Sequence, residues 1–213
     1  LDLKPIAVDT VTKRPQTPQP PFPYDERERQ VQHADGHTLA GTLTVPHGQG
    51  PFPTAVLISG SGSQDRDESL MGHKPFHVLA DHLSRNGVAV LRYDDRGVGD
   101  SLVGTSNLVD DTSLEFASDV ALWVKHLATE KDIDPTRIGL IGHSEGGLIA
   151  PIVAAQGADQ IAFIVLLSGP GVSGEEILPA QVEALLLAAG EDPLKIAVVT
   201  ARQRELLAAI MDE

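Results

Sequence analysis

The 213-residue sequence contains no cysteine. This absence excludes disulfide bridges, zinc sites built from thiolates and a cysteine nucleophile. It does not fix a compartment, because exported proteins can also lack cysteine, so cytoplasmic and periplasmic locations are both compatible with it. Hydroxyl, imidazole and carboxyl groups are the side chains left to carry chemistry.

Basic residues are few as well. Sixteen lysines and arginines stand against 30 aspartates and glutamates, which gives a formal net charge of −14. They are scattered along the chain and form no stripe that could neutralise a row of phosphates, so nucleic acid is not an expected partner. No apolar run approaches the roughly 20 residues of a membrane-spanning helix, so no membrane span is expected.

Residues 1–24 hold six prolines in a polar sequence that has neither a helical nor an alternating period. This composition predicts an extended, proline-rich linker. The chain begins at Leu1, without a methionine or the charged-then-apolar pattern of a signal peptide. We therefore expect a processed, excised or incomplete N-terminus.

Residues 25–174 carry the pattern of an α/β domain. Two alternating runs flank Asp35-Gly36, a dipeptide suited to a tight antiparallel hairpin. Four later runs are short, apolar and too continuous to be half-exposed, which is typical of parallel strands covered on both faces. They are "TAVLISG", "GVAVLRYD", "RIGLIGHS" and "IAFIVLLSG". With helical stretches between them, they predict a mostly parallel sheet with helices on both faces.

The residues around Ser144 fit a sharp turn between a strand and a helix. Gly142-His143-Ser144-Glu145-Gly146 matches G-x-S-x-G, in which small residues flank the serine because larger ones would collide with the neighbouring backbone. Such a turn exposes the serine hydroxyl, and the helix N-terminus offers N–H groups to a developing oxyanion. Ser144 is the candidate nucleophile, and the Glu145 amide is one candidate oxyanion donor.

A second glycine-rich loop, "ISGSGSQDRDE", directly follows the "TAVLI" strand. The second oxyanion N–H is expected from a loop at this place, and Ser61 and Gly62 are the candidates. A turn-forming role alone for the glycines is the alternative.

Three motifs taken together, "SGSGSQDRDE", "LRYDDRGVGDS" and "GHSEGG", resemble the α/β-hydrolase superfamily, in particular its bacterial serine esterases related to the prolyl oligopeptidase clan. The resemblance implies a cofactor-independent Ser-His-Asp hydrolase of small acyl esters. It makes residues 25–174 the N-terminal part of a hydrolase domain and residues 175–213, which are helix-like with a break near 190–193, a cap segment. It also implies that Asp94, Asp95 and Arg96 shape a loop rather than act in catalysis.

The sequence offers no general base for Ser144 at the expected place. In this fold the order along the chain is serine, acid, histidine. All eight histidines lie at or before the elbow, and His143 is unsuited because neighbours at a tight turn point apart. We therefore expect the chain to be a fragment that lacks the triad Asp and His and turns over little or no substrate.

Two other motifs predict no site. His73 and His77 are four residues apart but lack the Glu of an HExxH zinc motif, so no metal is expected. "GPGVSG" matches G-x-G-x-x-G but is not followed by a second strand that ends in an acid, as dinucleotide binding requires.

Other functions stay open at this point. An acyl-serine also forms from amides and thioesters, so a peptidase or thioesterase of the same fold is an alternative to an esterase. A non-catalytic, truncated module is another. Its C-terminal helices, with apolar residues 185–187 and the segment "RQRELLAAIM", would leave apolar surface that favours self-association, so a homo-oligomer is compatible with the sequence.

Overall fold

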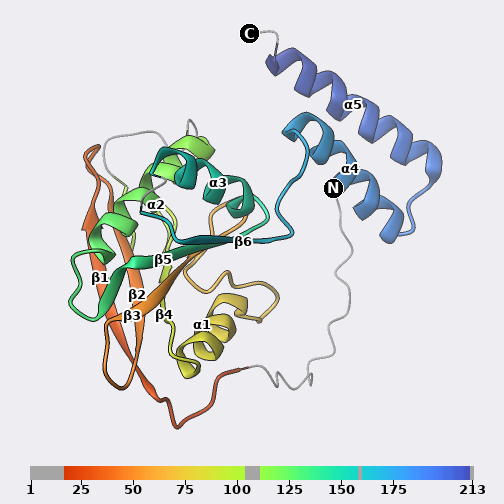
Figure 1. Cartoon of the computed structure of the whole chain (residues 1–213). Coiled ribbons are helices and arrows are strands. Elements are labelled where there is room, and N and C mark those ends of the chain that lie inside the picture. Colours follow the sequence, from red (N-terminus) through yellow and green to blue (C-terminus); the bar gives the residue numbers. More distant parts are fainter. Residues whose placement is uncertain (1–16, 104–110, 158–159, 212–213) are drawn as a thin grey trace. The chain divides into compact units, whose positions relative to one another are not determined.

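The computed structural model describes residues 17–103, 111–157 and 160–211 (Figure 1). The chain divides into two compact units, Leu1–Gly169 and Pro170–Glu213. Most of the predicted linker lies outside the described residues, and its described part, 17–23, contains no helix or strand. The predicted domain limits at residues 24 and 174 stay predictions.

The first unit is built on a six-stranded sheet with the strand order β1-β2-β4-β3-β5-β6. Strands β1 and β2 form the antiparallel hairpin around Asp35-Gly36, and β2 also pairs antiparallel with β4. The remaining pairs, β4 with β3, β3 with β5 and β5 with β6, are parallel. The expected fold class is therefore confirmed. The strands are β1 Tyr24–Gln32, β2 Thr38–Pro46, β3 Phe52–Ile58, β4 Ala89–Tyr93, β5 Ile133–His143 and β6 Phe163–Leu167.

Helices cover both faces of this sheet (Figure 1). Side chains alternate along a strand, so β3 sends Val56 and Ile58 to one face and Ala55 and Leu57 to the other. The first face packs against α2 (Ser113–Leu127) and α3 (Gly146–Gln156), with Trp123 fully buried between them and the sheet. The second face packs against α1 (Pro75–Arg85).

Strand β6 differs from the expectation that all four apolar strands are covered. Every residue of β6 is exposed, with Leu167 at 38% the least exposed and Leu166 at 49% the most. The physical reason is position, because β6 ends the strand order and pairs with β5 alone among the described strands. A parallel-strand pattern in a sequence does not tell which strand lies at an edge.

The second unit contains two helices, α4 (Gly174–Ala188) and α5 (Pro193–Met211). Ser173 caps α4 by accepting a hydrogen bond from the Glu176 N–H. The chain turns between the helices at Gly190, which has a φ of +72°, so the predicted helical break is confirmed. Among the described residues, no helix has the length and apolar character needed to span a membrane.

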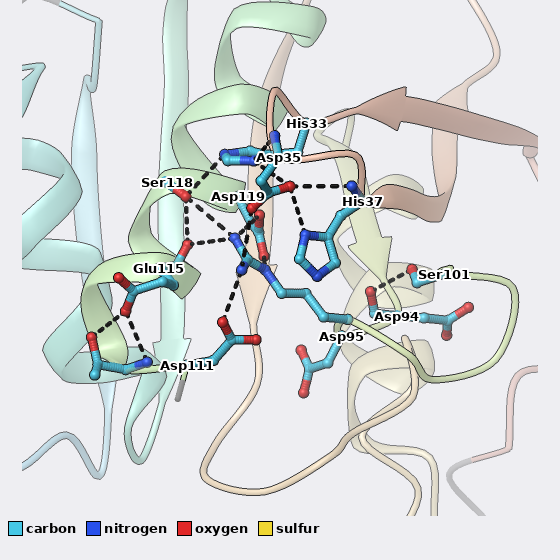
Figure 2. Close-up of polar contacts among 12 residues, drawn as sticks. His33, Asp35, His37, Asp94, Asp95, Ser101, Asp111, Glu115, Ser118 and Asp119 are labelled. Atoms are coloured by element: carbon cyan, nitrogen blue, oxygen red, sulfur yellow. Dashed lines mark hydrogen bonds and ion pairs between the residues drawn. The ribbon is translucent and has the colours of Figure 1, made fainter. Parts of the chain in front are cut away.

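The "DDRGVGDS" segment after β4 connects parts of the first unit through the hydrogen bonds of Arg96. Arg96 is almost fully buried and donates hydrogen bonds to both carboxylate oxygens of Asp119 on α2, at 2.6 and 2.8 Å. It donates a third to Asp111, at 3.1 Å. Figure 2 shows these carboxylates gathered between the end of β4, the start of α2 and the β1–β2 turn. These contacts are architectural, as the resemblance implies.

The two aspartates before Arg96 hold the glycine-rich loop that follows β3. Asp94 accepts hydrogen bonds from the backbone and side chain of Arg66, at 2.8 and 2.6 Å. Asp95 accepts from the Ser59 hydroxyl at 3.0 Å and from the Gln64 N–H at 2.9 Å. Both ends of the loop are therefore fixed by carboxylates from the neighbouring strand.

Burial of Asp95 predicts a pH-dependent stability. Desolvation raises the pKa of Asp95 to about 7, whereas the unfolded chain has the ordinary value of about 4. Between these values the folded state keeps a proton that the unfolded state releases. The free energy of unfolding should therefore fall as pH rises through this window, by up to about 4 kcal/mol from this group.

Asp95→Asn should remove most of this loss, so the difference in unfolding free energy between pH 5 and pH 8 should shrink, as measured by urea unfolding at both values. Asp134→Asn is the control. Hydrogen bonds from Thr136 and Arg137 lower the pKa of Asp134 to about 2, so it is ionised in both states throughout the window. An Asp95→Asn variant with an unchanged pH difference would contradict the assignment.

Candidate active site

Ser144 lies on a left-handed turn between β5 and α3. Strand β5 ends at His143 and α3 begins at Gly146, so only two residues reverse the chain. Ser144 has a φ of +52°, a conformation that a residue with a side chain adopts only under constraint. Two backbone hydrogen bonds of 2.9 Å hold it there, from its N–H to the Leu167 carbonyl and from the Gly147 N–H to its own carbonyl.

The glycines on either side of Ser144 are required by the backbone around them. A Cβ on Gly142 would lie 2.0 Å from the Gly146 carbonyl oxygen. A Cβ on Gly146 would lie 2.3 Å from the carbonyl oxygen of Ile58, at the end of β3. Neither neighbour is a side chain that could rotate away. The turn therefore exists only because both positions lack a side chain.

The loop after β3 runs directly beside the serine. A Cβ on Gly60 would lie 3.1 Å from the Ser144 Cβ. Gly62 and Glu145 together line a cavity of about 20 Å³. Among the described residues, the N–H groups of Ser61, Gly62 and Glu145 donate to no other protein group. The structure thus brings the expected oxyanion donors to the same edge of the sheet as Ser144 with their hydrogens uncommitted.

Glu68 fixes this loop against the elbow, and sequence reasoning did not identify it. Its Oε1 accepts a hydrogen bond from the Gly60 N–H at 2.8 Å and lies 2.7 Å from His143 Nδ1. Glu68 is buried and has a φ of +50°. The sequence shows it only as the end of "SQDRDE", because no spacing rule links a glutamate to a glycine eight residues earlier and to a histidine 75 residues later.

Among the described residues, the Ser144 hydroxyl makes no hydrogen bond to an imidazole. His143 is engaged with Glu68. His77 lies on α1, where it lines a cavity of about 330 Å³ together with His73 and Lys74. No residue of the elbow or of the glycine-rich loop lines that cavity.

Comparison with known proteins agrees with this geometry. The family model "Serine aminopeptidase, S33" matches residues 73–203. The esterase EstD of Thermotoga maritima is 35% identical over 147 residues, which are 69% of this chain and 34% of EstD. The esterase FrsA of Klebsiella pneumoniae is 29% identical over 153 residues, 72% of this chain and 34% of FrsA. The chain spans about a third of the length of these curated relatives.

Solved structures share the fold. The α/β hydrolase GrgF from Penicillium superposes with a TM-score of 0.60 at 21% identity, covering 77% of this chain and 53% of GrgF. The Pyrococcus furiosus esterase Pf2001 superposes with a TM-score of 0.56 at 21% identity, covering 84% of this chain and 64% of that protein. The strand order, the glycine-flanked elbow and the matching family model lead to one conclusion: the chain belongs to the S33 serine aminopeptidase family of the α/β-hydrolase superfamily.

Proposed function

We propose that this chain carries the nucleophile and the oxyanion hole of a serine esterase that cleaves small carboxylic esters. The observation that carries the proposal is the left-handed Ser144, packed beside a loop whose Ser61 and Gly62 N–H groups donate to no acceptor in the described part of the chain. A serine held in this way has its hydroxyl pre-positioned, and uncommitted amides are what a developing oxyanion needs.

The chemical steps follow from this arrangement. Ser144 Oγ attacks the ester carbonyl carbon and loses its proton to a base. The negative charge that develops on the carbonyl oxygen is held by the Glu145 amide and by the amide of Ser61 or Gly62. The alcohol leaves with a proton, and an acyl-serine remains. Water then attacks the acyl-serine, which releases the carboxylic acid and restores the hydroxyl.

The base and its orienting carboxylate are proposed to come from residues outside these 213. No histidine follows Ser144 in the sequence, and the chain spans about a third of EstD and FrsA. By this proposal the chain alone is nearly inactive, because removal of triad members typically costs about 10⁴ to 10⁶ in rate.

We propose esters as the first substrate class, because both curated relatives are named esterases. The matching family model is named for a serine aminopeptidase, which keeps amide cleavage as the second candidate. The two differ in the leaving group, so hydrolysis of p-nitrophenyl acetate compared with an amino-acid p-nitroanilide separates them.

Ser144→Ala should abolish ester hydrolysis in the natural gene product that carries these residues, with a loss of about 10⁴-fold or more in kcat against p-nitrophenyl acetate. Ser168→Ala is a matched control, because Ser168 is another serine with a left-handed φ, of +53°, at the end of the adjacent strand. It should keep most of the activity. Activity that survives Ser144→Ala would overturn the nucleophile assignment.

Glu68 is proposed to be a positioning residue for the oxyanion hole. Glu68→Ala would release the Gly60 N–H and let the following Ser61 and Gly62 amides move, so kcat should fall about 10²-fold with little change in KM, since one oxyanion donor is worth roughly 10² to 10³. Glu68→Gln keeps an oxygen that accepts from Gly60 and should restore most of the rate. A folded Ala variant with unchanged kcat would contradict this role.

A further inference from the structure

The turn between β1 and β2 brings two imidazoles and a carboxylate together, on residues that the hydrolase site does not use. Asp35 Oδ1 lies 2.8 Å from His33 Nδ1 and 2.6 Å from His37 Nδ1. One ligand-type atom from each of the three residues lies within 4.8 Å of the other two. Figure 2 shows the three side chains converging above the start of α2.

The contacts around His33 hold its ring in the cluster. The Ser118 hydroxyl lies 3.1 Å from His33 Nε2 and 2.6 Å from the Glu115 carbonyl oxygen. The other ring nitrogen, Nδ1, lies 2.8 Å from Asp35 Oδ1 and accepts a hydrogen bond from the Asp35 backbone N–H, at 3.4 Å. In the tautomer whose Nδ1 accepts this hydrogen bond, Nδ1 is unprotonated, which is the form of imidazole nitrogen that binds a metal ion.

The surrounding charge favours a cation. The only guanidinium among the described contacts of Asp35 is that of Arg96, at 3.6 Å, and it also neutralises Asp111 and Asp119. One positive group is thus shared by three carboxylates. The side chain of Asp111 is only 6% exposed, and its Oδ2 has no hydrogen-bond partner among the described residues. A divalent ion at the turn would balance the remaining negative charge.

We propose that His33 Nδ1, His37 Nδ1 and Asp35 Oδ1 bind a divalent first-row transition-metal ion, with Zn²⁺ the ion that suits two imidazoles and one carboxylate. Zinc lies about 2 Å from each of its ligand atoms. The three side chains, now in hydrogen-bond contact, need only small rotations to admit the ion between them. Water completes the coordination. Binding replaces the proton between His37 and Asp35, which is released to solvent.

The solvent exposure of the cluster and the contact between Ser118 and His33 both favour a metal site here. His37 is fully buried, but the side chains of His33 and Asp35 are 20% and 33% exposed, so an ion can reach the turn from solvent. Ser118 orients His33 through the ring nitrogen that does not face the ion, as outer partners of metal-bound histidines do. The ion would tie the β1–β2 turn to α2 and would take no part in the chemistry at Ser144.

The test uses the untagged natural gene product that carries these residues, titrated with Zn²⁺ by calorimetry and with Co²⁺ by visible absorption. We expect one ion per chain, tetrahedral Co²⁺ bands and a higher melting temperature with Zn²⁺. His33→Gln should weaken binding at least about tenfold and remove the bands, and Ser118→Ala should weaken binding about tenfold. Both variants avoid the fully buried His37, and circular dichroism checks that they fold.

The control is the double variant His73→Gln, His77→Gln, which removes the other close pair of histidines and should bind like the wild type. Two results would overturn the proposal. One is wild-type binding no tighter than that of His33→Gln, since an ion that His33 holds must be weakened when His33 is replaced. The other is binding lost only in the double variant.

Discussion

The close approach of backbone at Gly142 and Gly146 is the constraint on which the candidate site depends. A Cβ at either position would enter the carbonyl of a neighbouring segment, so strand β5 can turn into α3 within two residues only with glycine there. That tight reversal forces Ser144 to a positive φ and leaves the Glu145 N–H without an acceptor among the residues that the structure describes. The positions of the proposed nucleophile and of the proposed oxyanion donor thus both follow from the lack of side chains at these two glycines.

Carboxylates hold the other half of the site in place. Asp94 and Asp95 reach from the end of β4 to the loop after β3, and Glu68 ties that loop to Gly60 and His143. The negative net charge of the chain is therefore partly structural, because acidic side chains accept hydrogen bonds from loop amides that no helix or strand satisfies. Among the described residues, the N–H groups of Ser61 and Gly62 in this loop are left without a protein acceptor.

The fold could be predicted from the sequence because periodicity reports burial, and the β1–β2 hairpin, the parallel strands and both C-terminal helices are where the pattern places them. The turn at Ser144 could also be predicted, since G-x-S-x-G reflects the local need for small residues on both sides of the serine. The exposure of β6 could not be predicted, because a strand's place in the sheet is set by tertiary pairing. Glu68 could not be found, because its contact with His143 joins residues 75 positions apart. The cluster at His33, Asp35 and His37 is local, but which of its side chains meet depends on the backbone of the β1–β2 turn.

The central claim, that Ser144 is the reactive nucleophile, is tested most directly by covalent labelling. The natural gene product that carries these residues would be treated with diethyl p-nitrophenyl phosphate, which phosphorylates activated serines, and then digested and mapped by mass spectrometry. We expect one adduct per chain, on Ser144, with release of one equivalent of p-nitrophenol and loss of esterase activity in parallel. Inactivation with the adduct on another residue would contradict it.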